Sequence, residues 1–459
     1  MVNRLQTQLR EWGWSALVSS LILLQVAPAW AAYNHPVTWS DMSSLDLKPV
    51  LSSQYASETN LLQPSLPESA NELVLRDSDS LISPQFHVAE EMRSAVAFWL
   101  RIYTEFTTQH VVIFDSKHPE IVYEVLDFRE LAKTARNRVV YEIVQHGRIK
   151  KAMAAYHAAF ARLSRNAHPK NPSPQEKSIL RAIRATRHKH KISEFAHNLR
   201  TQTGQRDNII KGLLAAESFF PRMEMAFAKV GVPVELSRLA LVESSFDLQA
   251  KSRVGAAGVW QFMRASAKEY MRVDEAASID ERLSPLKSTV AAAKLLKRNY
   301  TILGNWSFAV TAYNSGHGKM PRNLKLPRDG AKVYEYFNAC SRVGRKLGHA
   351  GRNYFAEFLA VVHAEAYRHL YYGETPVQTF KPAQYQLVTK PETGLKIALS
   401  RSVSVQAFQF LNPDIRDLSK PLPRGFWVAV PADADDLAGL TEPKRVAATK
   451  SRMLVVSQN

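Results

Sequence analysis

Apolar residues recur every three or four positions through most of residues 206–370, and this periodicity constrains the fold more than any other feature. Segments such as LKSTVAAAKLLKRNYTIL gather alanine, leucine and tyrosine on one face, which is the pattern of an amphipathic helix. Residues 130–200 repeat the helical pattern, whereas residues 109–128 are rich in β-branched and aromatic side chains and predict short extended segments. The sequence therefore predicts a mainly α fold.

The N-terminus has the three parts of a secretory signal peptide. Arg4 and Arg10 supply positive charge, residues 16–26 are apolar, and Ala29-Trp30-Ala31 fits a small-x-small cleavage site. The apolar run is short for a membrane span, although an uncleaved anchor stays the alternative. We therefore expect residues 1–31 to be a signal peptide and the protein to be exported.

Changes in composition divide the rest of the chain. Residues 32–85 are rich in Ser, Asp, Leu and Pro without periodicity, which is typical of a linker or loosely packed arm. Residues 86–205 are interpreted as a helical N-terminal region, and residues 206–372 as the main helical domain. The pattern then becomes strand, helix, helix, strand over residues 383–432, and residues 433–459 form a polar tail.

The chain is strongly basic, with a formal net charge of +18, and it has a single cysteine, Cys340. One cysteine excludes an intramolecular disulfide, so the folded state relies on the burial of a large core. The charge fits an anionic partner. Because export disfavours nucleic acid, an anionic envelope surface or an acidic wall polymer remains. No feature of the sequence indicates an oligomeric state.

Signatures of metal and cofactor chemistry are missing from the sequence. It has no His-Glu-x-x-His motif, no cysteine pair, no glycine-rich phosphate loop and no Gly-x-Ser-x-Gly nucleophile elbow. His188 and His190 are two positions apart and face different directions on a helix, so we interpret them as part of a solvated basic face. We expect neither a metal nor a cofactor.

One carboxylate continues an apolar stripe. In the segment ELSRLALVESSFD, Leu236, Leu239 and Ala240 lie on one helical face, and the next position on that face is Glu243. Partial burial and the carbonyl end of the helix both disfavour the anion, so both raise the pKa of the Glu243 carboxyl. Such a group suits general acid catalysis, and a solvated glutamate at a frayed helix end stays the alternative.

Two later segments carry residues suited to a sugar substrate. In SRVGAAGVWQFM, Gly255 and Gly258 permit a close approach of the backbone, and Gln261 offers donors and acceptors to hydroxyl or N-acetyl groups. Trp260 and Phe262, in the same segment, fit core packing better than a ligand role. The segment AYNSG brings a tyrosine and an asparagine together at the end of a helix.

These segments, in this order and spacing, together with DERLSPLKSTVAAAKLL, resemble the goose-type-lysozyme-like domain of the lytic murein transglycosylases over residues 232–318. The resemblance implies a lysozyme-like helical catalytic domain at residues 206–372. It implies cleavage of the β-1,4 bond between N-acetylmuramic acid and N-acetylglucosamine in peptidoglycan glycan strands, leaving 1,6-anhydromuramic ends. The implied location is the bacterial periplasm or cell envelope, with possible membrane association.

The resemblance also implies roles for individual residues. Glu243 matches the single catalytic acid and base of the family. The implied substrate-binding residues are Ser244, Gln261, Met263, Tyr313 and Asn314. Two departures from the family pattern concern substrate preference. Arg264 stands where the family usually has proline, and GHGKM follows the Tyr-Asn pair in place of the commoner Gly-Pro-Gly.

Two other functions stay open at this stage. A lysozyme-like hydrolase would use Glu243 with a second carboxylate, for which Asp247 is the first candidate. Asp280 and Glu281 are interpreted instead as a solvent-facing pair at a helix start. A non-enzymatic wall-binding protein would keep the fold with a vestigial site.

The C-terminal residues 383–432 resemble a degenerate lysin motif, a module that binds glycan chains. The segments FLNPDI and GFWVAVP carry the resemblance, whereas PETGLKIA replaces the Gly-Asp-Thr-Leu that usually lies near the start of the motif. A small structural appendage is the alternative.

Overall fold

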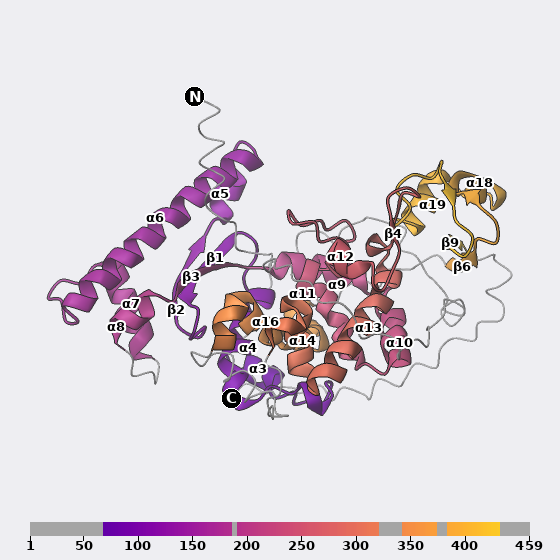
Figure 1. Ribbon diagram of the computed structural model, residues 1–459. Helices are drawn as coiled ribbons and strands as arrows, with labels where there is room; N and C mark the ends of the chain where they lie inside the picture. The colour runs from indigo at the N-terminus through magenta and orange to yellow at the C-terminus, as the bar shows by residue number, and fades with distance from the viewer. Residues whose placement is uncertain (1–67, 186–190, 321–341, 374–382, 432–459) are drawn as a thin grey trace, which may run out of the picture. The chain divides into compact units, whose positions relative to one another are not determined.

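The computed structural model describes residues 68–185, 191–320, 342–373 and 383–431 (Figure 1). The described residues fall into two compact units, which break between residues 373 and 383. Helices dominate both the count and the length of the elements, so the prediction of a mainly α fold is confirmed.

The first unit opens with helices around a small sheet. Its elements before residue 205 are α3 (Glu68–Leu75), η2 (Pro84–Phe86), η3 (Glu90–Met92), α4 (Arg93–Thr104), β1 (His110–Asp115), β2 (Val122–Asp127), α5 (Arg129–Thr134), α6 (Arg138–Arg165), α7 (Pro174–Arg184), α8 (Ile192–Ala196) and β3 (Leu199–Thr203). β1 lies between β2 and β3 and pairs with both in antiparallel register. The predicted extended segments are thus β1 and β2. Helices α6, α7 and α8 pack on this sheet around a shared apolar core.

The rest of the first unit is almost wholly helical. Its elements are α9 (Arg206–Ala216), α10 (Phe220–Val230), η4 (Val234–Arg238), α11 (Leu239–Ser244), α12 (Arg264–Ala267), β4 (Val273–Asp274), β5 (Ile279–Asp280), η5 (Glu281–Leu283), α13 (Pro285–Leu303), α14 (Trp306–Ser315), η6 (His317–Lys319), α16 (Arg342–Ala366) and α17 (Arg368–Tyr372). Glycines in the left-handed region end α10 and α13, as expected for helix C-termini.

Helix α16 is the element that joins the parts of the first unit. Its backbone breaks at Gly348, where φ is 67°, and most side chains after that point are buried. It packs against α4 of the N-terminal region and against α11 and α14 of the main helical domain (Figure 1). A side chain on α16 can therefore reach a group on α11, although the two helices are far apart in sequence.

Residues 68–85 differ from the loosely packed arm in which the sequence places them. Val74 and Leu75 of α3 are buried, and the carboxylate of buried Asp77 accepts a hydrogen bond of 2.8 Å from the hydroxyl of Tyr367. This segment thus packs onto the helical unit. Because α3 has only eight residues, its sequence shows no clear helical periodicity, and the composition of the segment alone suggested a linker.

The second unit has the predicted order of strand, helix, helix and strand. Its elements are β6 (Ala383–Leu387), β7 (Glu392–Thr393), α18 (Gly394–Ser400), α19 (Val405–Leu411), β8 (Pro421–Leu422) and β9 (Trp427–Pro431). β6 and β9 pair in antiparallel register. Whether this unit is a lysin motif stays a prediction. So do the lysozyme likeness of the main helical domain and the domain boundaries within the first unit.

Candidate active site

Glu243 lies at the end of a short helix, as its sequence predicts. Leu236, Leu239 and Ala240 are fully buried, and Glu243 follows them on the same face with its side chain only half-buried. The helix α11 ends one residue later, because Ser245 adopts a left-handed conformation with φ of 50°. The carboxyl of Glu243 therefore lies at the C-terminal end of α11, at the end of the buried face.

The turn after Glu243 depends on a glycine in a neighbouring helix. Gly212 of α9 approaches the turn so closely that a Cβ atom there would lie 2.2 Å from the carbonyl oxygen of Ser245. Only glycine permits this contact. Residue 246, a buried phenylalanine, is also left-handed, with φ of 56°, so tertiary packing holds two strained residues in succession.

The carboxyl of Glu243 is held by a tyrosine from α16. The hydroxyl of Tyr354, itself buried, donates a hydrogen bond to Oε1 of Glu243. Burial raises the pKa of Glu243 to about 7, and the hydrogen bond from Tyr354 lowers the pKa and so partly opposes burial. Glu243 is thus a carboxylic acid that is still largely protonated just below neutral pH.

A second carboxyl lies one helical turn further along α16. Glu357 is half-buried, and its pKa is raised to about 8, first by burial and then by the negative charge of Glu243. Burial, and then the negative charge of Glu357, raise the pKa of the Tyr103 hydroxyl on α4 well above its usual value. Two carboxyls with raised pKa values therefore share one region between α4, α11 and α16.

Tyr313 of α14 also lies close enough to Glu243 to be affected by its charge. Its hydroxyl donates a hydrogen bond of 2.9 Å to the backbone oxygen of Trp260, and burial and the charge of Glu243 keep its pKa well above the usual value. Asn314, next on α14, is half-buried, and no hydrogen bond of its side chain is found among the described residues. Trp260 and Phe262 are core residues, as expected, with 0% and 3% of their surface exposed.

The glycine-containing loop is tied to the helix that carries Glu243. The hydroxyl of Ser244 donates to the backbone oxygen of Val259 at 2.9 Å, which ties the loop to α11. The side-chain amide of Gln261 donates to the backbone oxygens of Gly258 at 2.8 Å and Ala250 at 3.3 Å. Its amide hydrogens therefore brace the loop, and its carbonyl oxygen is left for a ligand.

A buried ion pair between Arg282 and Asp280 holds this loop in place. Arg282 contacts both carboxylate oxygens of Asp280 at 2.9 Å and donates to the backbone oxygens of Gly255 at 2.8 Å and Phe262 at 3.0 Å. Gly258 approaches Arg282 so closely that a Cβ atom would lie 1.8 Å from its carbonyl oxygen. The close approach predicted for Gly258 is thus made to another segment of the same chain.

The interpretation of Asp280 and Glu281 as a solvent-facing pair is wrong. Their exposed fractions are 1% and 7%, and Glu281 accepts from the backbone nitrogen of Arg272 at 2.7 Å and pairs with Lys287 at 3.3 Å. Charged residues are buried here because each has a partner. Asp247, the candidate second carboxylate, is exposed, and it accepts a hydrogen bond of 2.9 Å from the backbone of Gln249.

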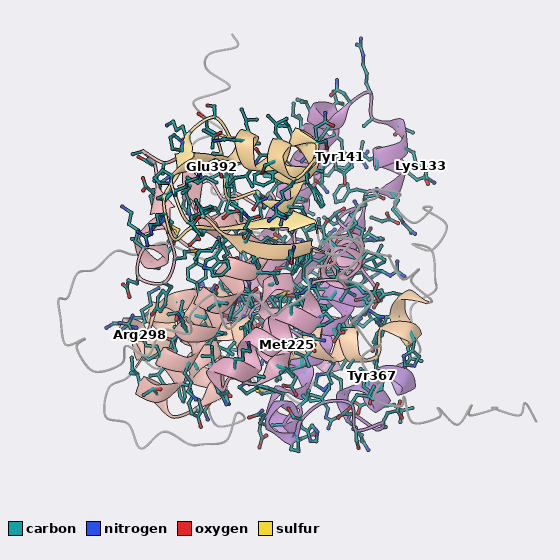
Figure 2. All side chains as sticks on the ribbon, turned by 90° about the vertical axis from the view of Figure 1, so that its right-hand side faces the viewer. Lys133, Tyr141, Met225, Arg298, Tyr367 and Glu392 are labelled. Atoms are coloured by element: carbon teal, nitrogen blue, oxygen red, sulfur yellow. The ribbon has the colours of Figure 1, made fainter. Side chains whose placement is uncertain are left out.

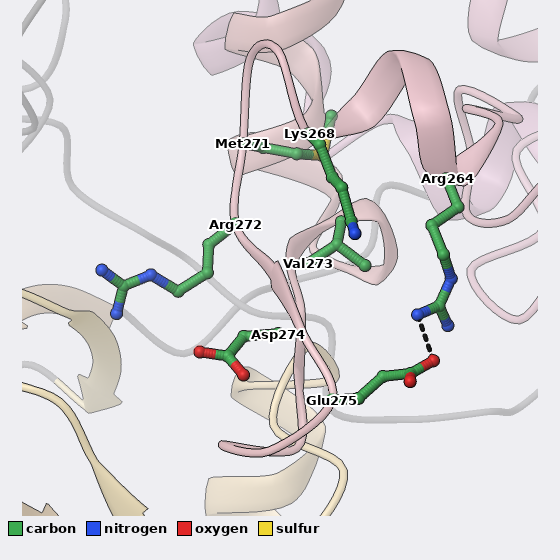
Figure 3. A pocket seen from close by; sticks show the side chains of 7 residues that line it. All are labelled: Arg264, Lys268, Met271, Arg272, Val273, Asp274 and Glu275. Carbon is green, nitrogen blue, oxygen red and sulfur yellow. Dashed lines mark hydrogen bonds and ion pairs between the residues drawn. The ribbon is translucent and has the colours of Figure 1, made fainter.

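A hollow is formed by α12 and the segment that follows it, and Glu243 is not among its lining residues (Figure 3). It is lined by Arg264, Lys268, Met271, Arg272, Val273, Asp274 and Glu275. Arg264, which departs from the family pattern, forms an ion pair with Glu275. Met263 itself is half-buried at the start of α12.

In the part of the chain that the structure describes, no group of three His, Cys, Asp or Glu side chains is arranged to hold a metal ion. His188, His190 and Cys340 lie outside the described residues. Sequence reasoning missed Tyr354 and Glu357. No local motif marks them, and only the contact of α16 with α11 reveals them.

Comparison with known proteins shows what part of the chain is similar to. Residues 224–335 match the family described as transglycosylase SLT domain. Membrane-bound lytic murein transglycosylase D of Escherichia coli K12 is 25% identical over 244 residues, which are 52% of this chain and 52% of that protein. A putative tributyltin chloride resistance protein of Alteromonas sp. M-1 is 32% identical over 110 residues, 24% of this chain and 53% of that protein.

Among solved structures, the 70 kDa soluble lytic transglycosylase of Escherichia coli is 16% identical, with a TM-score of 0.25, over 68% of this chain and 59% of that one. The chain spans about half the length of the curated relatives it matches. The match of residues 224–335 includes Glu243, the loop behind it and Tyr313. Residues 224–335 thus match the transglycosylase SLT domain family, and the resemblance to the lytic murein transglycosylases is confirmed.

Proposed function

We propose that this chain is a lytic transglycosylase of peptidoglycan in which Glu243 is the single acid and base. The observation that carries the proposal is the position of Glu243. It is a half-buried carboxyl at a helix end, held by the Tyr354 hydroxyl, with a pKa of about 7. A general acid is most effective when its pKa lies near the working pH.

The proposed reaction consumes no water. Protonated Glu243 gives its proton to the β-1,4 glycosidic oxygen, and the bond from this oxygen to C1 of N-acetylmuramic acid breaks. N-acetylglucosamine leaves with the proton on its hydroxyl. The Glu243 carboxylate then takes the proton from the C6 hydroxyl of the muramic residue, and that oxygen bonds to C1. The anhydro ring closes and Glu243 is protonated again.

The second carboxyl favours this route over hydrolysis. A hydrolase of the ordinary kind needs an ionised carboxylate as base or nucleophile beside its acid. Glu357, with its pKa raised to about 8, is largely neutral at pH 7 and cannot take a proton from water there. Asp247 is exposed and turned into its own loop. Neither carboxyl supplies the missing base.

The substrate-binding proposal follows the geometry around Glu243. The carbonyl oxygen of the Gln261 amide and the side chain of Asn314 are left for hydroxyl or N-acetyl groups, because neither is used within the described residues. We assign Tyr313 and Ser244 to holding the walls of the site, and Met263 to its margin.

Digestion of purified peptidoglycan followed by mass analysis of the muropeptides tests the proposal. We expect 1,6-anhydromuramic ends from the wild type and no cleavage by Glu243→Gln. Reducing ends that carry an added water would instead establish the hydrolase. Cleavage that persists in Glu243→Gln would remove Glu243 from its role, and an inactive wild type that binds sacculi would support the non-enzymatic alternative.

The proposed location is the periplasm or cell envelope, reached through the signal peptide at residues 1–31. Within the described residues, none of the helices combines the length and apolar character needed to cross a bilayer. The proposed partners are peptidoglycan glycan strands and an anionic envelope surface, without nucleic acid. The second unit is proposed to bind glycan as a lysin-motif-like module.

A further inference from the structure

The positive charge of the chain is concentrated in one region. Residues 129–200 hold seventeen Lys or Arg residues and four Asp or Glu residues, so they carry thirteen of the eighteen net positive charges. This region contains α5 to α8, on the side of the sheet away from α16, and none of the residues around Glu243 (Figure 1). The charge is therefore not explained by the candidate active site.

Helix α6 is the longest element of that region, and only one of its faces is packed. Its buried residues are Tyr156, Ala159, Phe160 and Leu163, all in its second half, and they pack on the sheet with α7 and α8. The opposite face is exposed along the helix. At a rise of 1.5 Å per residue, its 28 residues extend about 42 Å.

The first two turns of the exposed face are apolar. Val139, Val140 and Ile143 have exposed fractions of 64%, 39% and 66%. Positions 139 and 143 are four residues apart and positions 140 and 143 are three apart, so the three side chains are neighbours on the helix surface. Three exposed β-branched residues beside one another are unusual on a helix that packs its other face, and they indicate a contact surface.

The same face continues with basic residues. Lys150 and Lys151 are exposed one to three turns beyond the apolar side chains. Arg136 is exposed just before the helix, and Lys133 of α5 extends into solvent near its start, paired with Glu130 (Figure 2). Apolar side chains followed by lysines are typical of helices that lie in the headgroup layer of a membrane.

We propose that the exposed face of α6 docks this protein on an anionic lipid surface. Val139, Val140 and Ile143 enter the boundary between headgroups and acyl chains, and Lys150 and Lys151 lie over lipid phosphates. Charge alone would fit an acidic polymer as well. The three exposed apolar side chains favour lipid over a polymer, because a hydrated polymer has no apolar phase into which they could insert.

The helix lies along the surface and does not cross it. Charged residues occur in its middle, and its inner face is committed to the sheet. Docking through α6 leaves the Glu243 region free, since the two belong to different elements of the first unit. The proposal is therefore independent of the proposed reaction, and binding can be measured whether or not the protein cleaves peptidoglycan.

Sedimentation of the full-length mature protein with lipid vesicles tests this surface. One vesicle preparation is phosphatidylcholine, and the other is phosphatidylcholine and phosphatidylglycerol in equal parts. We expect binding to the second only, weakened in 1 M salt, where charges are screened within about 3 Å. Lys150→Gln with Lys151→Gln should weaken binding about twenty-five-fold, because each lysine near an anionic surface contributes about five-fold.

A second pair of variants separates lipid from polymer. Val139→Ser with Ile143→Ser should weaken vesicle binding at least about ten-fold, since apolar insertion is lost, while binding to purified sacculi is unchanged. The matched control, Lys211→Gln with Lys390→Gln, removes two exposed lysines elsewhere and should retain vesicle binding within about two-fold. Binding to sacculi without binding to anionic vesicles, or vesicle binding that survives Val139→Ser with Ile143→Ser, would overturn the proposal.

Discussion

Removal of the Tyr354 hydroxyl is the most direct test of how the protein sets the acidity of Glu243. The hydroxyl donates to the carboxylate, and this bond lowers the pKa of Glu243, while burial raises it to about 7. Tyr354→Phe keeps the ring and removes only the donor. The pKa of Glu243 should therefore rise.

The magnitude follows from the type of hydrogen bond. A bond to a charged acceptor contributes about 1.5–3 kcal/mol, and 1.36 kcal/mol corresponds to one pKa unit. We therefore expect the pKa of Glu243 to rise by about one to two units in Tyr354→Phe. Activity needs the protonated acid, so the alkaline limb of the pH profile should move from about pH 7 to between about pH 8 and 9.

The assay is the loss of turbidity of dilute purified sacculi over a range of pH, with anhydro ends confirmed by mass. Dilute substrate makes the profile report the free enzyme. The matched control is Tyr123→Phe, which removes a buried hydroxyl in the β-sheet region for which the described residues offer no hydrogen-bond partner. An alkaline limb that stays in place or moves to lower pH in Tyr354→Phe would refute the reasoning.

Three further outcomes are expected. The variant Glu357→Gln should keep the alkaline limb of the pH–activity profile and still form anhydro products, because Glu357 is already neutral where Glu243 titrates. Loss of activity in the muropeptide assay would instead assign Glu357 the role of a base. Gly258→Ala should lower the midpoint of thermal unfolding by several degrees, because its Cβ would lie 1.8 Å from a carbonyl oxygen, whereas Gly255→Ala, which meets nothing within 4 Å, should lower it less. Glu243→Gln should unfold like the wild type near pH 4 but be more stable, by up to about 3 kcal/mol in urea titrations, above pH 8. The pKa of Glu243 in the folded protein, about 7, exceeds its ordinary value of 4.5, so the stability that its proton contributes is lost as pH rises between these values. Equal free energies of unfolding for the variant and the wild type above pH 8 would contradict this.

Local pattern was enough to find the candidate acid. The stripe of Leu236, Leu239 and Ala240 fixes which face of the helix is buried, and the spacing then places Glu243 on that face. The same kind of reasoning placed the segment AYNSG at the end of a helix, and α14 does end at Ser315, with Gly316 as its C-cap. Such features depend on neighbours within a few residues, so the sequence contains the information that determines them.

Features that depend on residues distant in the sequence could not be predicted from local pattern. Tyr354 meets Glu243 across 111 positions, and no periodicity in either segment indicates the contact. Asp280 and Glu281 were expected in solvent because charged residues are usually exposed. Instead, Asp280 pairs with Arg282, and Glu281 accepts from the backbone of Arg272 and pairs with Lys287. The burial of a charge is decided by tertiary partners, which composition and spacing do not reveal.

The order in which the two carboxyls titrate connects the fold to the proposed chemistry. Glu243 ionises first, near pH 7, and its negative charge then helps to keep Glu357 protonated. After the first proton transfer the site therefore holds one carboxylate, Glu243, beside a neutral Glu357. Of these two carboxyls, only Glu243, which has just acted as the acid, is then available as a base, as ring closure on the C6 hydroxyl requires. A second ionised carboxylate would permit attack by water. The burial that raises both pKa values thus favours an intramolecular product, at a cost in stability that grows with pH.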